Sequence, residues 1–190
     1  LICMAGYVLF YIMIAFSQIY AKSAPTVSEA GYAMGLGFSP QIFTALLMCS
    51  AISLAITIAI SGKYIDIVGR RIWLIWTTVG VALFGLVLPY FLENGTTLSL
   101  FWFLIIGMGL IGMGYGPLAS FLPELFPTHA RYSGASLTYN IAGLFGASVA
   151  AIIALPLNAN YGLKGVGIYL TLNAVLSLIG LWFITETRDR

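Results

Sequence analysis

Charged side chains are rare in this chain, and several of them gather where they could form ion pairs. The 190 residues include 8 Lys or Arg and 6 Asp or Glu. Four of these lie within the ten-residue stretch GKYIDIVGRR, namely Lys63, Asp66, Arg70 and Arg71. Asp66 precedes Arg70 by four residues, so the two side chains can pair across one helical turn. Gly62 and Gly69 frame the stretch and allow tight turns of the backbone.

Neutral polar side chains inside apolar segments form the second group of candidates. The middle of each long apolar run contains no Asp, Glu, Lys, Arg or His, the residues that usually mark a proton or ion relay in a membrane. Tyr7, Tyr11 and Gln18 are spaced to share one helical face. Because an amide or phenol in hydrocarbon needs a partner or water, we predict a substrate path lined by Tyr7, Tyr11, Gln18, Tyr115, Tyr139 and Asn140. Hydrogen bonding between helices is the alternative role for these groups.

The run GMGLIGMGYGP combines closely spaced glycines with a proline. Gly112 and Gly116 form a small-xxx-small pair, which lets two helix backbones approach closely. Pro117 removes an intrahelical donor and tends to bend a helix. The run therefore predicts either a helix that flexes at Gly112, Gly116 and Pro117 or a tight and static packing surface, and the sequence leaves both open.

The composition indicates a protein that lies in lipid. The chain is 61% hydrophobic and 7% charged, with a mean hydropathy of +1.01, whereas a soluble domain carries about 25% charged residues. So few charges cannot cover a surface that faces water. Cys3, Cys49 and the single His129 are scattered, so the sequence predicts no metal site, no cofactor and no enzymatic nucleophile.

Six apolar stretches are long enough to cross a bilayer, whose hydrocarbon core of about 30 Å needs roughly 20 helical residues. We place these spans at about residues 1–20, 40–61, 72–92, 98–118, 133–155 and 166–185. The runs are continuous and lack the alternation of barrel strands, so they predict an all-α membrane protein. Six spans divide into two sets of three with opposite orientations, which predicts a 3+3 inverted repeat.

Basic residues predict the orientation of these spans, because cytoplasmic loops are enriched in Lys and Arg. One set of loops, with the C-terminus, carries Lys63, Arg70, Arg71, Arg131, Arg188 and Arg190, and the opposite set carries only Lys22 and Lys164. We expect the first set to face the cytoplasm. Acidic residues on that side complete a predicted cytoplasmic charge network of Gly62, Asp66, Gly69, Arg70, Arg71, Glu124, Arg131, Glu186 and Arg188. For the arginines, the positive-inside bias alone is the alternative explanation.

Three motifs resemble those of the major facilitator superfamily. GKYIDIVGRR has the form of its signature loop, Gly-x-x-x-Asp-x-x-Gly-Arg-Arg, and lies between the second and third predicted spans, as in that superfamily. PELFPTHARYSGAS, with Glu124 and Arg131, resembles the Glu-x-x-Pro-x-x-x-Arg element of sugar porters and metabolite/proton symporters, and the flanking residues are most similar to the symporters. ITETRDR is similar to the terminal motif. Ile67, where a basic residue often stands, and Thr185, in place of a proline, depart from these patterns.

The resemblance implies that the chain is the C-terminal six-span half of a transporter and lacks the N-terminal half. It implies a secondary active transporter in the plasma membrane that moves a small polar metabolite, such as an organic acid or osmolyte, together with protons by alternating access. A sugar-porter-type facilitator and a non-transporting sensor or scaffold on the same fold are the alternatives. The implied partners are the substrate, protons, the bilayer and the missing half, and not nucleic acid.

Overall fold

The computed structural model describes residues 1–183, apart from the side chain of Asp66. Its elements, in chain order, are α1 (Met4–Tyr11), η1 (Ile12–Phe16), α2 (Ser17–Lys22), α3 (Pro40–Val68), α4 (Arg70–Glu93), α5 (Thr97–Glu124), η2 (Thr128–Ala130), α6 (Arg131–Gly143), η3 (Leu144–Ser148) and α7 (Val149–Trp182). η1 and η3 are π-helical, and η2 is a 3₁₀ turn. Within residues 1–183 no strand occurs beyond one isolated bridge between Val27 and Ala33. The predicted all-α membrane fold is confirmed.

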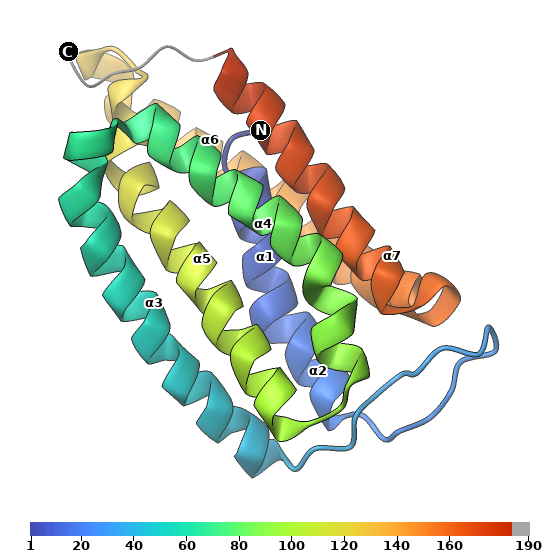
Figure 1. Cartoon of the computed structure of the whole chain (residues 1–190). Helices are drawn as coiled ribbons and strands as arrows, with labels where there is room; N and C mark the ends of the chain where they lie inside the picture. The colour runs from blue at the N-terminus through green and yellow to red at the C-terminus, as the bar shows by residue number, and fades with distance from the viewer. Residues whose placement is uncertain (184–190) are drawn as a thin grey trace.

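Five helical segments among the described residues are long and apolar enough to cross a membrane. The last of them, Thr128–Trp182, has 55 residues. As one straight helix it would be roughly 80 Å long, far more than a bilayer core of about 30 Å. The chain instead turns back at Gly162, where φ is 67°, and the two arms of α7 run in opposite directions (Figure 1). Counting these arms separately would give the predicted six spans, and that count stays a prediction.

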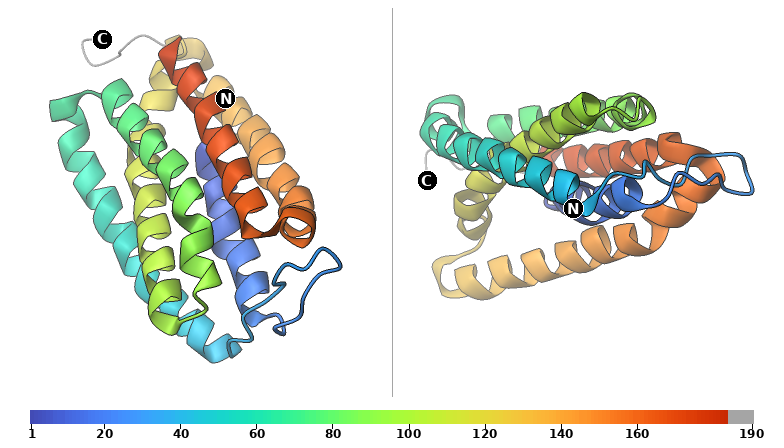
Figure 2. Two further views of the ribbon diagram at one scale, coloured as in Figure 1. Left: turned by 45° about the vertical axis from the view of Figure 1, so that its right-hand side comes forward. Right: turned by 90° about the horizontal axis from the view of Figure 1, so that it is seen from below.

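The helices pack around α5 and α4. α5 contacts α3 and α4, while α4 also packs on α7 and α7 on α1 (Figure 1). Phe84 of α4 and Phe103 of α5 stack with ring centroids 5.4 Å apart, and Met13 and Leu170 are fully buried in the same core. α3 is different, because only 11% of its most apolar stretch is buried inside the bundle. Most of its surface therefore faces outward from this bundle. In the two views of Figure 2, α3 lies at the outside of the bundle.

The glycines of α5 bring its backbone against α3. A Cβ added at Gly112 would lie 2.6 Å from the carbonyl oxygen of Leu54, and one added at Gly116 would lie 3.3 Å from that of Ile58. Gly112 therefore needs the absence of a side chain, whereas at Gly116 the backbone contact is tight and the Ser61 side chain would have to move. These contacts explain Gly112 and Gly116 as a packing surface, while flexing of this helix stays a prediction.

The charged stretch GKYIDIVGRR is helical, not a loop. α3 continues to Val68 and α4 begins at Arg70, so Gly69 alone separates the two helices. Gly69 has a φ of 101°, which confirms the tight turn expected there. The turn expected at Gly62 is wrong, because Gly62 lies inside α3 with open space where a Cβ would stand. One glycine costs a long helix only about 1 kcal/mol and does not end it.

The same turn changes the geometry expected for Asp66 and Arg70. Asp66 lies in the last turn of α3, and Arg70 is the first residue of α4. Gly69 interrupts the continuous helical turn that an i, i+4 pair requires. Asp66 and Arg70 therefore belong to different helices, and whether their side chains pair stays a prediction.

The longest connection, residues 23–39, is docked against the bend of α7. Ser28 Oγ donates a hydrogen bond to the carbonyl oxygen of Ala159 at 2.7 Å. Asn158 is buried, and its Nδ2 donates to the carbonyl oxygen of Ala33 at 3.1 Å. Two side-chain bonds thus hold an irregular segment to a helix more than a hundred residues away in sequence.

Candidate functional site

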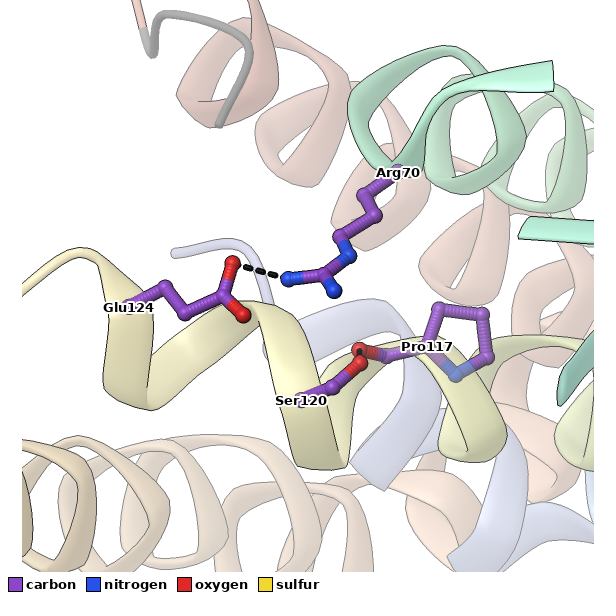
Figure 3. Close-up of polar contacts among 4 residues, drawn as sticks. All are labelled: Arg70, Pro117, Ser120 and Glu124. Carbon is purple, nitrogen blue, oxygen red and sulfur yellow. Dashed lines mark hydrogen bonds and ion pairs between the residues drawn. The ribbon is translucent and has the colours of Figure 1, made fainter. Parts of the chain in front are cut away.

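The charge cluster centres on an ion pair between two helix ends. Arg70 is the first residue of α4 and Glu124 is the last of α5. Because residues 94–96 join these helices as an antiparallel pair, the two ends meet at the same side of the bundle. Arg70 Nη1 pairs with Glu124 Oε2, and the side chains are 21% and 33% exposed (Figure 3). The structure therefore brings together two members of the predicted network from two different motifs.

Arg71 joins the same start of α4 to the end of α7. Its Nε donates to the carbonyl oxygen of Leu181 at 3.0 Å, and its Nη2 donates to that of Trp182 at 2.9 Å. The last carbonyls of a helix lack intrahelical donors, and a cation is favoured at this negative end of the helix dipole. Arg71 therefore caps α7, so the two neighbouring arginines hold α4 to two different helices.

Replacing Arg71 with Gln is expected to lower the free energy of unfolding by about 1 kcal/mol, because α7 loses its capping donors and the favourable charge at its end. The measurement is chemical or thermal unfolding of the detergent-solubilised protein. Lys63→Gln is the matched control, because it also replaces one basic residue with Gln. Lys63 is exposed in α3, and its Nζ lies 6.0 Å from the Tyr64 ring centroid. Equal losses in the two variants would argue against the capping role.

Other members of the predicted network are placed differently. Arg131 is exposed at the start of α6, and its guanidinium forms no ion pair with any residue in the range 1–183. Gly62 lies within α3 and makes no turn. Glu186 and Arg188 lie outside the described residues, as does the side chain of Asp66, so their part in the network stays a prediction.

Three of the predicted substrate-path tyrosines line one small cavity. Tyr7 of α1, Tyr115 of α5 and Tyr139 of α6 share its wall with Thr77 and Thr78 of α4. Its volume is about 40 Å³, enough for about one water molecule. Among the described residues 1–183, no charged side chain lines this cavity. The tyrosine cavity can therefore offer neutral hydroxyl groups, but a metabolite would need more space than it has here.

The remaining path candidates lie outside this cavity. Gln18 is exposed, and the Tyr11 hydroxyl donates to the carbonyl oxygen of Ala151 at 3.4 Å. Asn140 is exposed, and its Nδ2 donates to the carbonyl oxygen of Ser136 at 2.8 Å, one turn earlier in α6. The single helical face expected for Tyr7, Tyr11 and Gln18 is not kept, because the π-helical turn η1 lies between Tyr11 and Gln18 and rotates the later residue.

Sequence reasoning missed two contributions from α4. The capping role of Arg71 depends on a partner about 110 positions away, and Thr77 and Thr78 reach the tyrosine cavity from a helix that contributes no residue to the predicted path. Both threonine hydroxyls donate to carbonyl oxygens four residues earlier in α4. The only signal in the sequence for Thr77 and Thr78 was that they form a polar pair inside an apolar run.

Comparison with known families decides the class of the protein. The sequence profile of the family described as "Sugar (and other) transporter" matches residues 31–190, most of the chain. The chain belongs to this transporter family. The resemblance to the major facilitator superfamily drawn from its motifs is thereby confirmed. The family description and the names of the relatives indicate a transporter and not an enzyme.

Proteins similar to this member of the sugar (and other) transporter family are named as transporters. A protein of Haemophilus influenzae, whose name gives metabolite transport as a provisional function, is 90% identical over 190 residues, 100% of this chain and 42% of its own length. The inner membrane metabolite transport protein YhjE of Escherichia coli is 40% identical over 190 residues, 100% of this chain and 42% of its own length. The proline/betaine transporter of Salmonella typhimurium is 32% identical over 133 residues, 69% of this chain and 26% of its own length. No solved structure matches the chain significantly.

Proposed function

We propose that this chain forms the C-terminal membrane half of a secondary active transporter that moves a small polar metabolite across the plasma membrane. The chain spans about 42% of the length of the relatives with which it aligns in full, so the remainder would supply the other half. The observation that carries the proposal is the joining of three helix ends, those of α4, α5 and α7, by Arg70 and Arg71 in a member of a transporter family. We place these helix ends on the cytoplasmic side.

The strength of the Arg70–Glu124 pair suits a switch. Both side chains are partly exposed, and pairs of this kind contribute only about 0.2–1 kcal/mol. An interaction of that size shifts a two-state equilibrium by up to about fivefold and does not fix one state permanently. In the proposed mechanism the pair forms when the cytoplasmic ends of α4 and α5 are together, and it breaks when these ends separate.

For the substrate, we propose a neutral or zwitterionic metabolite. The tyrosine cavity presents hydroxyl groups, and none of its described lining residues carries a charge that would bind a substrate with only a carboxylate. Relatives named as proline/betaine transporters support a zwitterionic osmolyte, while the family description favours a sugar as the second candidate. In either case the small cavity would open into a larger path between this half and the rest of the protein.

Counterflow in proteoliposomes tests the transport proposal. The full-length protein is reconstituted with an excess of unlabelled compound inside, and uptake of labelled proline, betaine, glucose or a dicarboxylate is followed in separate assays. We expect uptake of one zwitterion or sugar, and stimulation by an inward proton gradient that an uncoupler abolishes. Folded protein that gives no counterflow with any member of the panel would instead favour the sensor or scaffold. Uptake unaffected by the proton gradient would favour a facilitator.

Tyr139→Phe is expected to raise the substrate KM by about two- to tenfold, because one hydrogen bond in the path contributes about 0.5–1.5 kcal/mol. Tyr132→Phe is the matched control on the same helix, since the Tyr132 side chain is 88% exposed. The measurement is the concentration dependence of counterflow, with the rate normalised to reconstituted protein. An unchanged KM in the Tyr139 variant would remove this hydroxyl from the path.

A further inference from the structure

Pro117 leaves one carbonyl of α5 without its helical donor, and a side chain from α4 takes that place. A proline has no N–H, so the carbonyl oxygen four residues earlier, that of Met113, has no intrahelical partner. The indole Nε1 of Trp73 donates to this oxygen at 2.9 Å. The hydrogen bond that α5 lacks within itself is therefore supplied by the neighbouring helix.

The same turn of α4 contacts α5 on the other side of the proline. Arg70 and Trp73 are three residues apart, so both lie on the same face of α4. Trp73 binds Met113 before Pro117, and Arg70 pairs with Glu124 after it. Figure 3 shows the Arg70 side chain extending from above Pro117 toward Glu124. The two contacts come from one turn of α4, and their positions on α5 are about 16 Å apart along the helix axis.

We propose that Trp73 is a positioning residue that, together with Arg70, holds α5 on both sides of Pro117, so that this part of α5 flexes only when α4 releases it. Hydrocarbon offers no water to replace a lost donor, so the Met113 carbonyl depends on Trp73 for its partner. The orientation of α5 at Pro117 is then coupled to the position of α4. The proposal concerns this helix pair and does not depend on which compound is transported.

A double-mutant cycle in the full-length protein tests the coupling. Trp73→Phe keeps an aromatic ring and removes the donor, while Pro117→Ala restores the backbone N–H that would serve Met113 within α5. We expect Trp73→Phe to lower the melting temperature by about 2 °C or more when Pro117 is present. The same change in the Pro117→Ala background is expected to have little effect, because the carbonyl then has its own helical donor. Trp76→Phe is the matched control, since Trp76 is 74% exposed on the same helix.

Equal losses from Trp73→Phe in the two backgrounds would overturn the proposal, because they would show that the ring matters only for packing. The absence of any loss when Pro117 is present would overturn it as well. If the Pro117→Ala variant does not fold, Pro117→Ser restores the same N–H. Hydrogen exchange gives an independent measurement that needs no change at Pro117: uptake by peptides covering residues 113–121 should rise in Trp73→Phe and not in Trp76→Phe. Unchanged exchange in that region would contradict the proposed hold on α5.

Discussion

Reversing the charge of Arg70 is expected to lower the initial rate of transport by about tenfold. In Arg70→Glu a carboxylate faces Glu124 where a guanidinium stood, so an attraction between the ends of α4 and α5 becomes a repulsion. Two charges about 4 Å apart near a protein surface interact by about 4 kcal/mol at most, and partial exposure reduces that figure substantially. A remaining cost of about 1.4 kcal/mol corresponds to the tenfold change if the joined state lies on the transport cycle.

Two further variants decide whether the pair itself is responsible. Arg70→Glu combined with Glu124→Arg restores opposite charges and should recover a large part of the rate. Arg131→Glu removes a positive charge from the same predicted side but touches no described ion pair, so it should change the rate by less than about twofold. Rates are measured as counterflow, normalised to the amount of correctly folded protein. An equal loss in Arg131→Glu would point to the positive-inside bias as the role of these arginines, and a double variant as slow as Arg70→Glu would exclude the pair.

Replacing Gly112 with Ala is expected to lower the free energy of unfolding by about 1–3 kcal/mol, the usual cost of forcing a methyl group into a close-packed contact. The added Cβ would meet the Thr57 hydroxyl, which can rotate away, and the Leu54 carbonyl oxygen at 2.6 Å, which cannot. α3 and α5 would have to separate to relieve that contact. The loss would be measured by chemical unfolding in detergent.

Gly114→Ala is the control for this prediction, because it changes the same helix two residues later. A Cβ there would lie 3.7 Å from the Thr77 methyl group, an ordinary van der Waals distance. Since alanine favours a helix more than glycine by about 1 kcal/mol, Gly114→Ala should be neutral or slightly stabilising. If Gly112→Ala were equally well tolerated, α5 would not pack on α3 as closely as the structure indicates.

Hydropathy predicted where this chain lies in lipid, but it could not predict where the helices end. The apolar run of the second span covers residues 40–61 and is followed by Gly62 and Lys63, whereas α3 continues to Val68. A helix that extends beyond the membrane no longer needs apolar side chains there. Its backbone hydrogen bonds still favour continuation of the helix. A turn at Gly69 could be predicted, because glycine adopts positive φ values readily. The observed φ of Gly69 is 101°.

The partners of side chains were predicted only where motifs carried them. Arg70 and Glu124 belong to two recognisable motifs on the same side, so their proximity could be expected. The contact of Arg71 with the end of α7 depends on how α4 crosses α7, and no local pattern encodes that crossing. The displacement of Gln18 has a different cause, because a π-helical turn inserts a local change of register into an otherwise regular apolar run.

The docking of residues 23–39 has a consequence for the order in which the protein is made. Ser28 and its partner Ala159 are 131 positions apart, and ribosomes add about 5–20 residues per second. The segment therefore leaves the ribosome roughly 7–26 s before its docking site exists. During that interval the segment lacks its partners in α7 and is open to proteases and to reagents that label exposed chain. Most of the segment stays exposed after folding, so pulse-labelling should find a loss of accessibility on completion of α7 only around the part-buried Ser28.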